Sequence, residues 1–377
     1  MRKNLTMLLA AALACACQKD DTDFSAYTSQ TGTQTTIYIQ YDGNTATVSG
    51  DAQGIVSTSG AHVTVSSQYA DSLLLVLTGT TTNGSLLVSR TRSYGIRLDG
   101  VAITNPNGPA INNQGKKPLY LHCTTGTQNT LADGTAWTEQ SYDQKATLFS
   151  EGSLVLLGTG TLNVTANSKN AIASDDDITI MDNVALNTVT QATASNGLKA
   201  NDGIYIHGGT TSIRVASDGG RGLRCDSVTV VTAGTTTIST TGNCAIDSIT
   251  DNADGTRDTT YSSAACIRSN GTFTMSGGTL TLNSSGDGGK GINCDQPVLF
   301  SGGTLRAVTT GTNILAKPKA VKSDVSITLS GGSFYAEVDK SWACDNGTES
   351  DTPADHLTIV GTPLTSSVSK KLVIVSY

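Results

Sequence analysis

The chain has 377 residues, a formal net charge of −7, 40 glycines and only 5% aromatic residues. This charge disfavours a nucleic-acid-binding role, because there is no basic stripe to displace phosphate counterions. The abundance of Gly, Thr, Ser, Asn and Asp favours short strands and turns over helices. The sequence contains no run of eighteen or more apolar residues, so we expect no membrane-spanning helix.

The first sixteen residues have the layout of a secretory signal peptide. Arg2 and Lys3 form a basic start, and residues 5–16 are almost wholly apolar. Small residues directly before Cys17 resemble a bacterial lipobox, which would make this cysteine the lipidated N-terminus. Cys15 fits the usual box slightly better, but the residues that follow favour Cys17. A plain secreted protein with a polar linker is the alternative.

The residues after Cys17 resemble the acidic export tag of surface-exposed lipoproteins in one group of Gram-negative bacteria. The tag would be Gln18, Lys19, Asp20 and Asp21. We therefore expect residues 1–16 to be a lipoprotein signal peptide and residues 17–35 a lipidated N-terminus and linker. The protein would then be a cell-surface-exposed lipoprotein of the outer membrane, in contact with the membrane through its lipid alone.

Further along, the chain carries an internal repeat with a period of about one β-helix turn. One apolar marker recurs in motifs such as "NAIASDD" and "KGINCDQ". The markers are Leu148, Ile172, Leu198, Leu223, Ile246, Ile267, Ile292 and Val321. Eight residues after each marker except Ile246 comes a second apolar residue. In five of the units it is followed by a glycine turn such as "SGGT" and a second alternating strand. These second apolar residues are Leu156, Ile180, Ile206, Val231, Met275, Phe300 and Leu329.

A unit of this length cannot bury its own apolar face, but stacked units can, each about 4.8 Å above the last. We therefore predict an all-β, single-stranded parallel β-helix (solenoid) of about ten coils, each roughly 25 residues long, over residues 36–345. The residue two positions after the marker is small, so Cys225 and Cys294 are predicted to be packing residues. Segments 124–142 and 251–263 are predicted insertions, and residues 346–377 are predicted closing strands.

These coils resemble the calcium-containing, right-handed parallel β-helix carbohydrate-binding domains of bacterial surface and extracellular proteins. The resemblance runs from about Thr36 to Val338. Its motifs are "IRLDGVAITNPNGPAI", "TTGTQNTLADG", "ATLFSEGSLVLLGTGTLNV", and "GDGGKGINCD" followed by "SGGTL". It implies a right-handed helix, bound calcium, and carbohydrate binding rather than cleavage, on an architecture related to that of polysaccharide lyases.

Acidic and amide side chains recur at the predicted coil corners. Carboxylates stacked one coil apart repel one another, so a row of them favours a hard cation with oxygen ligands. Ordinary solvated turns are the alternative. The insert "TDNADGTRD" resembles a calcium loop but lacks the acidic residues expected at both ends. The row of acidic corner residues and the family resemblance together make calcium the expected ion. The candidate ligands are Asp175, Asp176, Asn201, Asp202, Asp218, Asp226, Asn252, Asp254, Asp258, Asp287, Asp295 and Asp324.

The sequence shows no catalytic constellation, because its four histidines lack zinc-ligand spacing and no serine sits in a nucleophile elbow. A lyase on this scaffold would need a basic residue beside calcium to abstract a proton from a uronate. Arg221, Arg224 and Lys290 lie near the acidic corners, but we expect them to pair with those aspartates.

Aromatic platforms for sugar rings are few, and a Trp in a loop is as often a packing lid. The candidates are Trp137, Tyr142, Tyr335 and Trp342. Cys244 and Cys266 flank the second predicted insertion, nearly in phase on neighbouring coils. They form either a disulfide or two buried thiols, and the spacing leaves both alternatives open.

We expect a monomeric, surface-anchored lipoprotein that binds polysaccharide, of acidic or plant cell-wall type, through a calcium-stabilised β-helix. A surface that repeats every 4.8 Å or so suits an extended, repetitive polymer, and we expect binding without catalysis. A polysaccharide lyase on the same scaffold is the first alternative. A protein-binding adhesin or structural surface module is the second.

Overall fold

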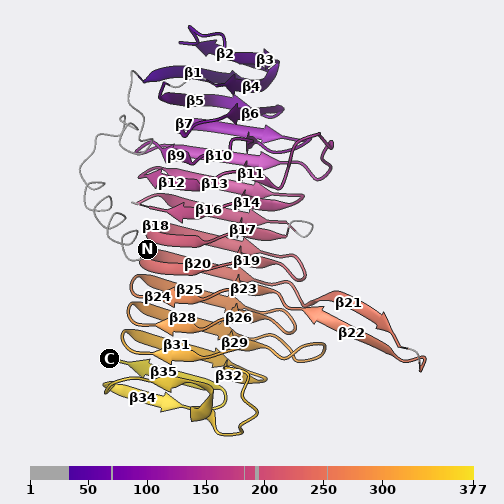
Figure 1. The fold of residues 1–377 in the computed structure, drawn as a ribbon, viewed down its shortest axis with the longest axis vertical. Helices are drawn as coiled ribbons and strands as arrows, with labels where there is room; N and C mark the ends of the chain where they lie inside the picture. The colour runs from indigo at the N-terminus through magenta and orange to yellow at the C-terminus, as the bar shows by residue number, and fades with distance from the viewer. Residues whose placement is uncertain (1–33, 69–70, 182, 192–194, 253) are drawn as a thin grey trace.

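The computed structural model describes residues 34–377 except 69–70, 182, 192–194 and 253. It is an elongated stack of coils, with β1 to β3 at one end and β34 at the other (Figure 1). The predicted signal peptide, Cys17 and the predicted export tag lie outside the described residues. No helix within the described part of the chain is long and apolar enough to cross a membrane.

One wall of the stack is a 12-stranded sheet in which the strands follow one another in chain order. It consists of β3 (Val56–Ser59), β4 (Ala61–Ser67), β6 (Gly84–Arg90), β8 (Ile111–Asn113), β11 (Ala146–Ser150), β14 (Asn170–Ser174), β17 (Asn196–Ala200), β19 (Arg221–Cys225), β23 (Ala265–Ser269), β26 (Lys290–Cys294), β29 (Lys319–Ser323) and β32 (Trp342–Asp345).

The remaining coil strands join in a 21-stranded sheet. It consists of β1 (Thr35–Asp42), β2 (Thr45–Ser49), β5 (Leu73–Thr81), β7 (Tyr94–Asn105), β9 (Leu119–Cys123), β10 (Gln128–Asp133), β12 (Leu154–Gly158), β13 (Thr161–Ala166), β15 (Ile178–Ile180), β16 (Ala185–Thr190), β18 (Ile204–Val215), β20 (Thr229–Thr240), β24 (Phe273–Met275), β25 (Thr279–Ser284), β27 (Val298–Phe300), β28 (Thr304–Thr309), β30 (Ile327–Leu329), β31 (Ser333–Val338), β33 (Thr358–Ile359), β34 (Thr365–Val368) and β35 (Leu372–Ser376). A separate hairpin of β21 (Ala245–Asp251) and β22 (Arg257–Ser262) projects from the stack, and a short 3-10 helix, η2, spans Pro353–His356.

Parallel pairing of equivalent positions confirms the predicted β-solenoid. Leu148 pairs with Ile172, Ile172 with Leu198, and Leu198 with Leu223. The same register continues through the later markers to Cys344. The solenoid has about 11 turns of roughly 25 residues, close to the predicted ten.

The core lies between the two walls and is built from the predicted apolar positions. The markers other than Ile246, and the residues eight positions later, all belong to one continuous buried cluster. Phe300 and Phe334 pack edge to face with ring centroids 5.5 Å apart. Cys225 and Cys294 are fully buried in the same cluster, which confirms that they are packing residues.

Two details of the predicted register are wrong. Ile246 does not mark a coil, because Leu223 pairs directly with Ile267 while Ile246 lies 60% exposed on the projecting hairpin. The predicted insertion 124–142 contains a coil strand, since β10 pairs in parallel with both β7 and β13. Only the segment 134–145, which lies between β10 and β11, leaves the coil.

Antiparallel strands flank the coils at both ends. β2 pairs with β1, and β35 pairs with β31 and β34. The Tyr377 hydroxyl donates to the backbone oxygens of Leu329 and Val360, which fastens the end of the chain to the last coils. These strands satisfy backbone groups that the terminal coils would otherwise leave open.

Replacing Phe300 by Asp should unfold the neighbouring coils, because its side chain is 1% exposed and an unpaired buried carboxylate is strongly unfavourable. We expect a loss of unfolding free energy of about 4 kcal/mol or more. Leu299→Asp is the matched control, since Leu299 is 40% exposed on the same strand. Urea unfolding followed by far-ultraviolet dichroism measures both. Equal stability of the two variants would contradict the assigned register.

Candidate functional site

From β11 to β29, the strands of the 12-stranded sheet present two residues each to the outside because they bend just before the marker. The residue preceding the marker has no ladder partner, and both it and the marker face the core. Gly222 occupies this position because an added Cβ would lie 2.2 Å from Ile238 Cγ2. The residue after the marker and the first residue of the strand therefore share the outer face, where Ala146, Phe149 and Ala173 form a cluster separate from the core.

Parallel pairing arranges these outward residues in two rows. The basic row follows the markers and consists of Lys199, Arg224, Arg268, Asn293 and Lys322. The edge row consists of the first residues, Asn170, Asn196, Arg221, Ala265, Lys290, Lys319 and Trp342. A protein of net negative charge thus collects seven cationic side chains on one face.

Four of these cations pair with carboxylates. Arg268 holds Asp295 through two hydrogen bonds of 2.7 and 2.8 Å, and Lys319 Nζ lies 2.5 Å from Asp345. The other two pairs are Arg224 with Asp226, at 3.6 Å, and Lys322 with Asp324. The expectation that the corner cations pair with aspartates is therefore correct for Arg224.

That expectation is wrong for Arg221 and Lys290, which form no ion pair with any described carboxylate. Arg221 Nη2 donates to Ser262 Oγ, and its buried Nε has no hydrogen-bond partner among the described residues. Lys290 Nζ donates to Ser263 Oγ and, at 3.2 Å, to the backbone oxygen of Gly288. Both positive charges are therefore met by neutral oxygens at the base of the hairpin.

Burial and mutual repulsion act on these two cations together. Burial, and then the guanidinium groups of Arg224 and Arg268, lower the pKa of Arg221 to about 10. Burial, and then the ammonium groups of Lys322 and Lys319, lower the pKa of Lys290 to about 8. The face therefore holds more positive charge than its carboxylates neutralise.

Several predicted metal ligands also form a row, which runs along the C-terminal ends of the strands of the 12-stranded sheet. The corner row lies three residues after each marker, where the backbone ladder continues from coil to coil. It consists of Glu151, Asp175, Asn201, Asp226, Asn270, Asp295 and Asp324. Asn201 donates to Asp175 and Asn270 donates to Asp226. Asp176 and Asp202 stack at the next position, joined through their backbones.

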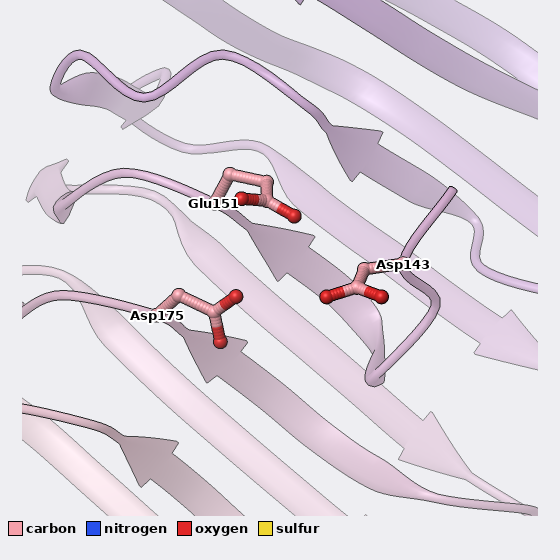
Figure 2. A group of neighbouring side chains, drawn as sticks. All are labelled: Asp143, Glu151 and Asp175. Atoms are coloured by element: carbon pink, nitrogen blue, oxygen red, sulfur yellow. The ribbon is translucent and has the colours of Figure 1, made fainter. Parts of the chain in front are cut away.

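Three carboxylates converge at one end of the corner row. Ligand oxygens of Asp143, Glu151 and Asp175 all lie within 4.8 Å of one another (Figure 2). Lys145 Nζ lies 2.7 Å from Asp143 and 2.6 Å from Asp175. Burial, and then the charges of Asp175 and Asp143, raise the pKa of Glu151. The cluster keeps an excess of negative charge even beside this lysine.

The sequence analysis missed Asp143 and Glu151. Glu151 was identifiable, because it occupies the corner position after Leu148 in the quoted motif "ATLFSEG". Asp143 gave no such signal, because it belongs to the segment 134–145, which returns to the coil corner only through folding.

Other predicted ligands lie apart from the corner row. Asp218 and Asp287 precede their strands of the 12-stranded sheet rather than follow them. Asp218 accepts a hydrogen bond from the backbone of Asn243. Asp287 accepts from Thr312 Oγ1 and the backbone of Ile314, each at 2.7 Å. Burial alone would raise the pKa of Asp287, but these donors lower it to about 2, so this carboxylate fastens a loop.

The remaining three predicted ligands lie in the projecting hairpin, Asn252 and Asp254 in its turn and Asp258 at the start of β22. Asp254 Oδ1 accepts from both the backbone N–H and the hydroxyl of Thr256. Asn252 donates to Thr256 and to Asp258 Oδ2. The turn thus supplies donors to its own oxygens, on a hairpin that projects from the stack (Figure 1).

Trp342 ends the edge row, but its ring is not a free platform. His356 stacks on it with a centroid distance of 4.1 Å, and Lys370 Nζ lies 4.5 Å from its centroid. Two groups this close need opposite faces of the indole ring. Only the edge of the ring is left for a ligand.

The other predicted aromatic residues lie elsewhere. Trp137 and Tyr142 are half-buried in segment 134–145, where Trp137 Nε1 donates to Asp133 and Lys169 covers the ring at 5.0 Å. Tyr335 lies on β31 in the other sheet and donates to Glu337. The structure therefore does not bring the four candidates together.

Cys244 and Cys266 are both buried and free in the structure. Cys244 Sγ lies 3.5 Å from Asp287 Oδ2, whereas Cys266 Sγ contacts Thr240 Oγ1 at 3.8 Å. Of the two alternatives that the sequence left open, the structure has the two buried thiols.

Comparison with known proteins adds three findings. The sequence model of a family described as "carbohydrate-binding domain-containing protein" matches residues 59–347. No curated protein matches the chain. A solved structure of "the polysaccharide lyase-like protein from C. thermocellum", a gadolinium derivative, is similar with a TM-score of 0.55 and 21% sequence identity. That similarity covers 74% of this chain and 100% of the other, and at this identity it concerns the fold alone.

Proposed function

Because the chain belongs to the carbohydrate-binding domain family, we propose that it binds polysaccharide along the outer face of the 12-stranded sheet. The basic and edge rows repeat the same chemistry at the spacing of the strands, about 4.8 Å. Such a surface offers many equivalent contacts to an extended polymer, each weak alone and strong in sum.

The proposed ligand is an acidic polysaccharide, and one observation carries this choice. Arg221 and Lys290 are cations whose partners on this face are neutral oxygens. A uronate carboxylate would give both cations an anionic acceptor, and a hydrogen bond between two opposite charges is stronger than one from a cation to a neutral oxygen. The carboxylates already on this face pair with four of the other five cations, all except Lys199, and leave the positions of Arg221 and Lys290 to the ligand.

A calcium ion, implied by the family resemblance, is proposed at Asp143, Glu151 and Asp175. Three carboxylates beside one lysine suit a hard divalent cation with oxygen ligands. The ion would link the segment 134–145 to the coil corner, so its proposed contribution is to stability rather than to chemistry.

A polysaccharide lyase is the second candidate, favoured by the lowered pKa of Lys290. A lysine with a pKa of about 8 is partly neutral near physiological pH and can accept a proton. The family description favours a role without catalysis, and we propose binding as the function.

Surface anchoring through a lipid on Cys17, preceded by a signal peptide and followed by the export tag, is part of the same proposal. A lipidated N-terminus would attach the solenoid to the outer membrane and leave its sheets accessible to large extracellular glycans.

Replacing Lys290 by Met or Arg221 by Gln should weaken binding to polygalacturonate about 10- to 100-fold at pH 7, which corresponds to one charged hydrogen bond of about 1.5–3 kcal/mol. Binding by the unaltered protein should weaken as pH rises through about 8, because Lys290 then loses its charge. Lys290→Arg should abolish this pH dependence, because arginine stays charged. Isothermal titration calorimetry over a pH series measures these effects.

Arg257→Ala is the control, because Arg257 is exposed on the hairpin and pairs with Asp251. Its binding should be unchanged. A neutral glucan that competes as well as the acidic polymer would contradict the proposed ligand class. Ultraviolet-absorbing unsaturated products that disappear in Lys290→Met would establish the lyase instead.

Calcium should raise the melting temperature, and a chelator should reverse the effect, because an ion that binds only the folded state stabilises it by about 2.7 kcal/mol at 100 times its Kd. The double variant Asp143→Asn, Glu151→Gln should lose this response. Asp254→Asn, in the hairpin turn, should keep it. Differential scanning calorimetry distinguishes the two sites, and the opposite pattern would move the ion to the hairpin.

Cys17→Ala should release the protein from the membrane fraction and abolish metabolic labelling with fatty acid, whereas Cys15→Ala should change neither. Fractionation and labelling of cells that express each variant provide the readout. Labelling that persists in Cys17→Ala would overturn the assigned lipidation site.

A further inference from the structure

A pocket of about 260 Å³ lies at the C-terminal end of the outer face. Its lining includes Lys319 and Trp342 from the sheet and Glu349 and Asp351 from the segment that follows β32. Pockets for drug-sized ligands measure about 300–1,000 Å³, so this one suits a smaller group, on the order of one sugar ring.

The pocket continues the line of the edge row. In the parallel strand pairing, Lys290 lies beside Lys319, and Lys319 lies beside Trp342, the last member of the row. A polymer that follows Arg221 and Lys290 along the face therefore reaches the pocket next.

Beyond the pocket the face is closed by the segment 346–357. β32 is the last strand of the 12-stranded sheet, and η2 then places His356 against Trp342. The segment is cross-linked within itself, since His356 Nε2 lies 2.9 Å from the backbone oxygen of Ser350 and Ser350 Oγ lies 2.5 Å from Asp355. A polysaccharide chain that lies along the edge row would end against the segment 346–357.

The polar groups of the pocket suit a terminal sugar acid, because the exposed Lys317 can meet its carboxylate and the acidic side chains can accept from its hydroxyl groups. Asp345 forms an ion pair with Lys319. Glu349 and Asp351, in contrast, are exposed and form no hydrogen bond or ion pair with described residues. His356, which is 2% exposed, also lines the pocket, and its Nδ1 lies 3.8 Å from Asp345 Oδ1 but has no hydrogen-bond partner among the described residues. Carboxylates accept hydrogen bonds from hydroxyls, and a terminal sugar has one more free hydroxyl than an internal one.

We propose that this pocket binds the terminal residue of a polysaccharide chain, so that the protein recognises chain ends in addition to chain interiors. This inference rests on the proposed function, because it assumes that the chain lies along the edge row. Lys290 and Arg221 then contact the interior of the bound chain, and Glu349 and Asp351 contact its end.

The test compares short oligogalacturonides with long polygalacturonate, using the double variant Glu349→Gln, Asp351→Asn. The variant should bind the oligomers about 10-fold more weakly and the polymer almost normally, since ends are a small share of a long chain. Asp339→Asn, an exposed change outside the pocket, should leave both affinities intact. Oligomers modified at the reducing end and oligomers modified at the other end should show which end enters.

Two results would overturn the inference alone: unchanged oligomer binding by the double variant, or full binding of oligomers modified at both ends while the polymer still binds. Failure of the unaltered protein to bind either ligand would instead overturn the proposed function. Equal weakening for oligomer and polymer would assign the pocket to the chain interior and also overturn end recognition.

Discussion

In-register parallel stacking is the constraint on which this structure depends. Each coil hydrogen-bonds to the next at a fixed spacing, so residues at equivalent positions become neighbours and every position becomes a row. The row of markers is buried in the core because each marker is apolar. A shift of one residue would turn the apolar set outward, so the hydrophobic pattern holds the register. Gly222 shows how tight the bend before the marker is, because a side chain there would collide with Ile238.

The same stacking places like charges next to one another on the surface, where they repel. The middle of the corner row relieves this by alternating acids with amides, as in Asp175 with Asn201 and Asp226 with Asn270. Three of the four cations of the basic row relieve it by pairing with carboxylates of the corner row. Arg221 remains outside both arrangements, and so does Lys290. Burial, and then repulsion by neighbouring cations, lower the pKa values of both groups, which marks the place where an anion would relieve the most unfavourable charge.

Periodicity in the sequence was enough to predict the coils, the core and most of the corner row, because each depends on spacing within one repeat. It failed where the chain leaves the repeat. Ile246 has coil-like spacing yet lies on an exposed hairpin, and Asp143 reaches the acidic cluster through a segment that has no period. The isolation of Lys290 was also hidden, because its neutral partner Ser263 comes from the end of the hairpin insertion. Contacts between an insertion and another coil are long-range, and a repeat pattern carries no information about them.

The hairpin of β21 and β22 interrupts the chain between two coils that nevertheless pair directly, Leu223 against Ile267. Removing or exchanging it therefore leaves the ladder of the solenoid continuous. Changes in the length or sequence of the hairpin therefore do not interrupt the parallel pairing of the coils around it. Its base lies beside Arg221 and Lys290, so such changes alter the surroundings of two cations of the proposed ligand-binding face without rebuilding the core. Ligand preference can then change separately from the fold.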